Sequence, residues 1–81
     1  MKIYDSKSKR ELGRVTLYLT PDEASELADT ARSLAKNPNQ HHGHVNNADY
    51  SREVTIAVYT PENMSQFDAE SQRLLEDDGK P

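Results

Sequence analysis

The sequence predicts an α+β protein with a four-stranded antiparallel sheet and two helices on one face, in the chain order β-β-α-β-β-α. Residues 11–19 and 53–59 alternate apolar with polar side chains at the period of a half-buried strand. Residues 20–36 and 64–76 repeat apolar residues at helical spacing. Because each strand has one apolar face and each helix one apolar stripe, we expect the helices to cover one sheet face and leave the other open.

The first two strands are expected over residues 2–4 and 11–19, joined by a polar turn. Side chains alternate along the second strand, so two groups face opposite ways. The group expected to pack beneath the helices is Val15, Leu17 and Leu19, and the group expected on the open face is Arg14, Thr16 and Tyr18.

The first helix is expected to begin after Thr20 and to end near Lys36. Thr20 can cap the helix, Pro21 suits the first helical position, and Glu23 can close a capping box. The sequence Asn-Pro-Asn at residues 37–39 then ends it.

The second half of the chain is expected to hold an edge strand through His42, His44 and Asn46, then a clean strand over residues 53–59. In the clean strand the inward group is Val54, Ile56 and Val58, and the outward group is Thr55, Ala57 and Tyr59. A last helix is expected from residue 64 or 65 to Glu76.

The two halves also correspond to each other. An offset of 40 residues aligns Thr20-Pro21 with Thr60-Pro61 and Leu34 with Leu74. The chain would then consist of two copies of one strand–strand–helix unit. A coincidence between two ordinary helix starts explains the same alignment, so the sequence leaves an internal duplication and a coincidence both open.

A chain of 81 residues has room for one core, which predicts a single domain over residues 1–78 and a frayed tail at 79–81. Apolar residues are 33% of the sequence, against roughly 45–50% in ordinary globular proteins, so the core is expected to be thin. No cysteine is present, which excludes disulfides and thiolate metal sites. Small chains with thin cores often gain stability from a second subunit, so we expect a homodimer.

Charge is unevenly distributed along the chain. Residues 1–14 carry a net charge of +3, and residues 15–81 carry −7. An acidic body disfavours nucleic-acid binding, which needs clustered basic residues. No stretch reaches the length and apolarity of a membrane span or a secretion signal, so we expect neither a membrane partner nor export, and a cytoplasmic location.

These features favour recognition of a protein with a basic surface, through the open sheet face and the acidic side of the last helix. The residues expected to bind this partner are Tyr18, Tyr59, Thr16, Thr55, Glu70, Glu76, Asp77 and Asp78. The last three acids lie at the negative end of the helix dipole, where acids are disfavoured. A functional acidic patch and a solvated tail both account for them.

Three histidines fall together at positions 41, 42 and 44. On a strand, His42 and His44 project from the same face and could share a divalent metal ion. A solvated connection, or a partner-binding edge whose affinity changes as the histidines are protonated, fits the same residues. No glycine-rich phosphate loop or nucleophile elbow is present, so we expect no enzymatic activity and no cofactor.

The Thr-Pro-Asp-Glu helix from Thr20 to Lys36, the His-rich segment and the strand that follows resemble small bacterial immunity-type proteins. Phage-encoded anti-defence proteins share the same outline of small, acidic, cysteine-poor α+β domains. Either resemblance implies a non-enzymatic protein that inhibits another macromolecule by binding it stoichiometrically. It carries no binding residue across to this chain.

Overall fold

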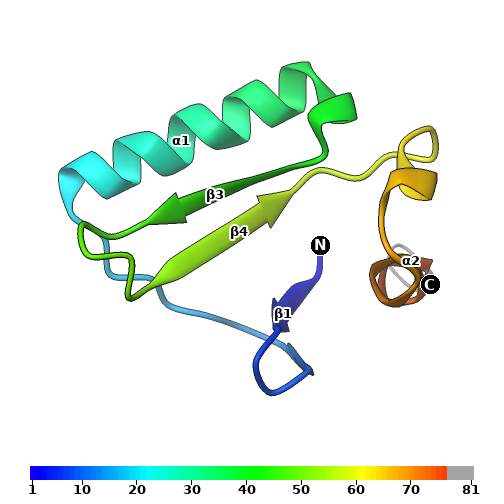
Figure 1. Cartoon of the computed structure of the whole chain (residues 1–81), viewed down its shortest axis with the longest axis horizontal. Coiled ribbons are helices and arrows are strands. Elements are labelled where there is room, and N and C mark those ends of the chain that lie inside the picture. The colour runs from blue at the N-terminus through cyan, green and yellow to red at the C-terminus, as the bar shows by residue number, and fades with distance from the viewer. Residues whose placement is uncertain (77–81) are drawn as a thin grey trace. The chain divides into compact units, whose positions relative to one another are not determined.

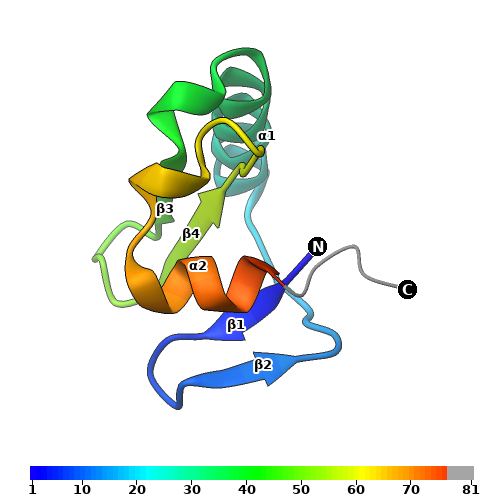
Figure 2. The same ribbon diagram turned by 90° about the vertical axis from the view of Figure 1, so that its right-hand side faces the viewer.

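In the computed structural model, which describes residues 1–76, the chain forms two compact units. One unit consists of Met1–Tyr18 and the chain from Phe67 onward, and the other is Leu19–Gln66. The single domain over residues 1–78 stays a prediction of the sequence. Each unit contains one α-helix and one two-stranded sheet (Figures 1 and 2).

The α+β class is confirmed, but the single four-stranded sheet is wrong. Strand β1 (Ile3–Asp5) pairs antiparallel with β2 (Arg10–Leu12), and β3 (His42–Asn46) pairs antiparallel with β4 (Glu53–Ala57), as two separate sheets. The order of elements also differs from the expected one, because two 3-10 helices are inserted: η1 (Pro38–Gln40) and η2 (Met64–Gln66).

The expected second strand is much shorter than its pattern suggests. Strand β2 ends at Leu12, and residues 14–20 adopt no regular secondary structure. Val15 is 54% exposed, Leu17 44% and Leu19 37%, so the prediction that these three pack beneath the helices is wrong. Alternating side chains specify a strand only where a neighbouring strand completes its hydrogen bonds, and no other strand of residues 1–76 pairs with this segment.

Helix α1 (Pro21–Lys36) forms where the sequence predicts it. The Thr20 hydroxyl oxygen accepts from the backbone N–H of Glu23 at 3.2 Å, and the Glu23 carboxylate accepts from the N–H of Thr20 at 2.9 Å. This reciprocal pair satisfies two N–H groups that would otherwise lack a partner at the helix start. At the other end, the N–H of Asn37 donates to the carbonyl of Ser33.

Helix α1 packs on one face of the β3–β4 sheet (Figure 1). Leu34 of α1 and Val45 of β3 are the two buried apolar side chains of the described chain, at 2% and 4% exposure. Gly43 permits this close packing, because a Cβ atom there would lie 2.7 Å from Cγ2 of Thr30. The side chains of Val54 and Ile56 in β4 are half-buried on the same face.

The second Thr-Pro sequence does not start a long helix, and Thr60 and Asn63 instead form a pair of reciprocal hydrogen bonds. The Thr60 N–H donates to Oδ1 of Asn63 at 2.7 Å, and the Asn63 N–H donates to Oγ1 of Thr60 at 3.0 Å. Asn63 is 1% exposed, and its Nδ2 also donates to the carbonyls of Pro38 and Val58. The side-chain amide thereby joins η1, the residue that follows β4 by one position and the segment before η2.

The last helix is also shorter than predicted. Helix η2 ends at Gln66, and α2 (Ala69–Glu76) begins anew after Asp68. Oδ1 of Asp68 accepts from the N–H of Ser71 at 2.7 Å, which is the geometry of an N-terminal cap. The expected continuous helix over residues 64–76 is therefore wrong, because the Asp68 side chain starts a new helix within it.

Candidate functional site

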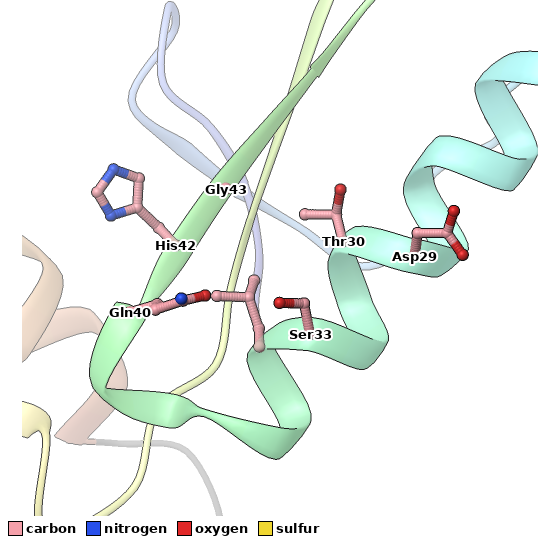
Figure 3. A pocket seen from close by; sticks show the side chains of 7 residues that line it. Asp29, Thr30, Ser33, Gln40, His42 and Gly43 are labelled. Atoms are coloured by element: carbon pink, nitrogen blue, oxygen red, sulfur yellow. The ribbon is translucent and has the colours of Figure 1, made fainter.

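The side of the β3–β4 sheet that faces away from α1 carries exposed polar side chains. Antiparallel pairing sets His42 opposite Ala57, His44 opposite Thr55, and Asn46 opposite Glu53. We call this group the outer sheet face: His42, His44, Asn46, Glu53, Thr55 and Ala57. All but the half-buried Asn46 are exposed, and Figure 3 shows the His42 ring on the side of β3 away from α1. The prediction that His42, His44 and Asn46 share a strand face is confirmed.

His44, Glu53 and Thr55 form a connected cluster on this face. Nδ1 of His44 lies 2.5 Å from Oε1 of Glu53 and 2.9 Å from Oγ1 of Thr55. The Thr55 hydroxyl donates to the same Glu53 oxygen at 3.2 Å. An ionised carboxylate can only accept hydrogen bonds, so Nδ1 of His44 carries the proton. The Glu53 carboxylate is thereby held in one orientation across the two strands.

His41 and His42 meet at their Nδ1 atoms, which lie 2.8 Å apart. Two nitrogens bound to one tetrahedral zinc ion at about 2.0–2.1 Å lie about 3.3 Å apart, so this spacing is that of a hydrogen bond. The rings of His42 and His44 are 5.1 Å apart, edge to face. Across residues 1–76, no three His, Cys, Asp or Glu side chains are grouped to hold a metal ion.

The two tyrosines expected on one open sheet face do not share a sheet. Tyr18 is 94% exposed and lies with Thr16 in the segment without regular structure. Tyr59 is half-buried and follows β4 in the other unit, where Thr55 is exposed on the outer sheet face. The pairing of β1 with β2 and of β3 with β4 leaves the expected common face unformed.

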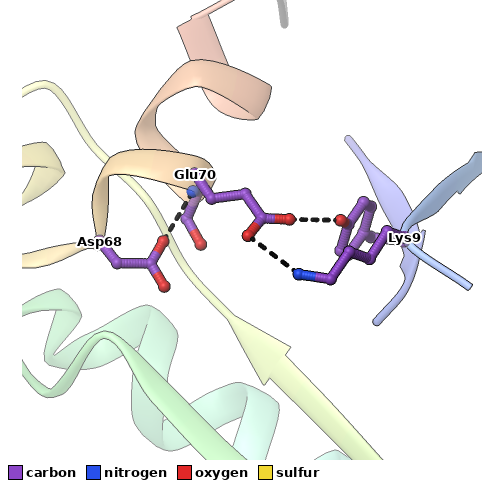
Figure 4. Close-up of polar contacts among 5 residues, drawn as sticks. Lys9, Asp68 and Glu70 are labelled. Carbon is purple, nitrogen blue, oxygen red and sulfur yellow. Dashed lines mark hydrogen bonds and ion pairs between the residues drawn. The ribbon is translucent and has the colours of Figure 1, made fainter. Parts of the chain in front are cut away.

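The acidic residues expected in a free patch have different surroundings. The Tyr4 hydroxyl donates to Oε1 of Glu70 at 2.6 Å, and Nζ of Lys9 lies 3.7 Å from Oε2 (Figure 4). The hydrogen bond to Glu70 raises the pKa of the Tyr4 hydroxyl. Glu76 is exposed at the end of α2, and Asp77 and Asp78 lie outside the described residues. Glu70 is therefore engaged by the hairpin of its own unit.

Two hollows accompany these groups. One, of about 290 Å³, lies between α1 and β3, with polar groups from Asp29, Ser33 and Gln40 on its rim (Figure 3). The other, of about 250 Å³, lies beside the Tyr4–Glu70 contact.

Two structurally central residues, Glu53 and Asn63, are not among the residues that the sequence predicts to bind a partner or a metal ion. Glu53 begins a strand, and its role follows only from the strand register that brings His44 within reach. Asn63 occupies the position of Glu23 when the halves are aligned at an offset of 40, and that correspondence was the available signal.

Comparison with known proteins gives no relative: no family model, no curated protein sequence and no solved structure matches this chain. Within the part of the chain that the structure describes, none of the helices has the length and apolarity needed to cross a membrane.

Proposed function

We propose that this chain is a non-enzymatic protein that inhibits a basic partner protein by binding it stoichiometrically through the outer sheet face. The observation that carries the proposal is the fixed Glu53 carboxylate, held by His44 and Thr55 on an exposed sheet surface. A carboxylate that is already oriented loses little freedom when an Arg or Lys side chain of a partner binds it.

The charge of the surrounding unit supports a basic partner. Residues 19–66 contain seven acidic and three basic residues, a net charge of −4. A field of one sign speeds association with an oppositely charged surface and disfavours partners of like charge.

The first step of the test is affinity capture with the full chain, followed by calorimetric titration of the captured protein. We expect a basic protein that binds at a 1:1 ratio and loses its own activity at one equivalent. Its Kd should rise when ionic strength is raised from about 0.05 to 0.5 M, because salt screens exposed charges.

Two variants locate the surface. Glu53→Gln should weaken binding about tenfold, a free-energy loss of about 1.4 kcal/mol. Ala28→Gln, on the exposed side of α1, should bind as the unaltered chain does. If the Kd of saturable binding changes neither with salt nor with the Glu53 substitution, the outer sheet face is not the binding surface. If a captured enzyme stays fully active when it is saturated with this chain, the chain is not an inhibitor.

A divalent-metal site at His42 and His44 is the second candidate, favoured by the two imidazoles on one face of β3. Because the Nδ1 atom of His44 is hydrogen-bonded, the free Nε2 nitrogen would be its ligand. Calorimetry with zinc or nickel on the chain and on the His42→Ala/His44→Ala variant decides this candidate. Heat that the variant abolishes supports it, and no heat from the unaltered chain rejects it.

A further inference from the structure

An apolar segment of the chain lies exposed without the strand partner that its sequence pattern requires. In the stretch from Arg14 to Leu19, four large apolar or aromatic side chains are each at least 37% exposed: Val15, Leu17, Tyr18 and Leu19. No backbone N–H or C=O of these residues forms a hydrogen bond to the backbone of another described residue. We call this stretch, residues 14–19, the unpaired segment. Soluble proteins rarely expose contiguous apolar side chains unless something covers them.

The β3–β4 sheet offers a matching open edge. The N–H of Val58 donates to His41, and the N–H of Asn47 donates to Arg52, which fixes the alternation of the antiparallel ladder. By that alternation, Val54 and Ile56 direct their backbone groups toward β3. Glu53, Thr55 and Ala57 then direct theirs to the opposite side, where no strand of the described chain pairs with β4. An open edge of this kind is a template for another strand.

The side chains of the two elements also match. Val54 and Ile56 are only half-buried on the α1 side of β4, and Val58, which directly follows the strand, is half-buried too. A strand beside β4 that places Val15, Leu17 and Leu19 on the same side would extend this apolar row beneath α1. The alternate residues, Thr16 and Tyr18, would then lie beside Thr55 and Ala57 on the outer sheet face.

We propose that this chain forms a homodimer in which the unpaired segment of each copy adds as a strand to the open β4 edge of the other copy. Charge favours a second copy as the occupant. Residues 1–18 carry five basic and two acidic residues, net +3, whereas residues 19–66 carry net −4. Two such contacts related by a two-fold axis bring opposite charges together twice and bury both apolar segments.

The mass in solution is the first measurement. The chain is 9.2 kDa, and light scattering across micromolar to millimolar concentrations should return twice that mass. Leu17→Lys places a charge in the apolar row and should return the monomer mass. Because residue 17 makes no ladder bond within the described chain, the circular dichroism spectrum should stay unchanged. Ala28→Lys, an exposed helical control, should remain dimeric.

The absence of cysteine allows the contact to be located. A copy carrying Tyr18→Cys is mixed with a copy carrying Thr55→Cys or Ala57→Cys and oxidised. We expect a disulfide between the two different copies in at least one mixture, and none when Tyr18→Cys is mixed with Ala28→Cys. A monomer mass at every concentration overturns the proposal. A dimer in which neither outer-face cysteine joins residue 18 overturns it as well, because another surface then holds the copies together.

Discussion

The side-chain amide of Asn63 donates a 2.8 Å hydrogen bond to the carbonyl of Pro38, 25 positions earlier in the chain. The same nitrogen donates to the carbonyl of Val58, and Oδ1 accepts from the N–H of Thr60. One side chain, 1% exposed, thus bonds to three backbone groups, one in η1 and two in the stretch that follows β4. A buried amide in this position acts as a rigid connection between elements that hold little apolar area.

Removing this amide should destabilise the unit strongly. Asn63→Ala leaves the Val58 carbonyl and the Thr60 N–H without the side-chain partner they have here, and we expect the free energy of unfolding to fall by about 2–4 kcal/mol. The Pro38 carbonyl loses one of its two hydrogen bonds and keeps the one from the N–H of His41. Asn63→Asp should cost at least as much, because a carboxylate would face two carbonyl oxygens. Urea denaturation measures both, with the exposed Asn39→Ala as the control. Equal stability of Asn63→Ala and the control would contradict this role.

The close approach of β3 to α1 should make Gly43 intolerant of a side chain. A Cβ atom there would lie 2.7 Å from Cγ2 of Thr30, so we expect Gly43→Ala to lower the free energy of unfolding by about 1–3 kcal/mol. Thr30→Ser removes the obstructing methyl group and should restore part of the loss in the double variant. Gly13→Ala meets no atom within 4 Å and should shift stability by less than about 0.5 kcal/mol. Absence of any rescue would show that the methyl contact is not the cause.

The capping box at Thr20 should contribute measurably to α1. Thr20→Ala removes the acceptor of the Glu23 N–H, and the expected loss is about 1 kcal/mol in the free energy of unfolding. Thr20→Ser keeps the hydroxyl and should retain most of the stability. Ser25→Ala, within the same helix and exposed, should be neutral or slightly stabilising because alanine is the better helix former. Thermal unfolding followed by circular dichroism compares the three variants. Equal losses of stability for Thr20→Ala and Thr20→Ser would show that the Thr20 hydroxyl does not stabilise the helix.

The Tyr4–Glu70 hydrogen bond should make stability fall at high pH. It raises the pKa of Tyr4 above its ordinary value of 10.0, because the bond forms only while the hydroxyl is protonated. A group whose pKa is raised on folding contributes stability below its unfolded pKa and loses that contribution as pH rises through the folded pKa. The Tyr4→Phe variant should therefore lack this part of the alkaline decline.

Spectroscopic titration of tyrosinate provides the direct measurement. One of the four tyrosines should ionise at a pH above the ordinary pKa of a tyrosine. Glu70→Gln should lower the pKa of that tyrosine back toward the ordinary value. Lys9→Gln is the control, because Lys9 contacts the other carboxylate oxygen and leaves the hydrogen bond in place. Identical titrations of the unaltered chain and Glu70→Gln would mean that the hydrogen bond does not form in solution.

The candidate site could be anticipated only in part. That His42 and His44 share a face follows from strand periodicity, which is a local property. That Glu53 and Thr55 hold His44 depends on the hairpin register, in which residue 44 lies opposite residue 55. A shift of one residue would put the same side chains on opposite faces, and no local pattern reports that shift.

Local chemistry of the sequence determined the α+β class, the capped helix α1 and the alternation in β3 and β4, because capping and periodicity act over a few residues. Tertiary structure decided which strands pair, where α2 begins and what Asn63 joins. Val15, Leu17 and Leu19 show the reason: their alternation is suited to a strand, but a strand exists only where another backbone completes its hydrogen bonds.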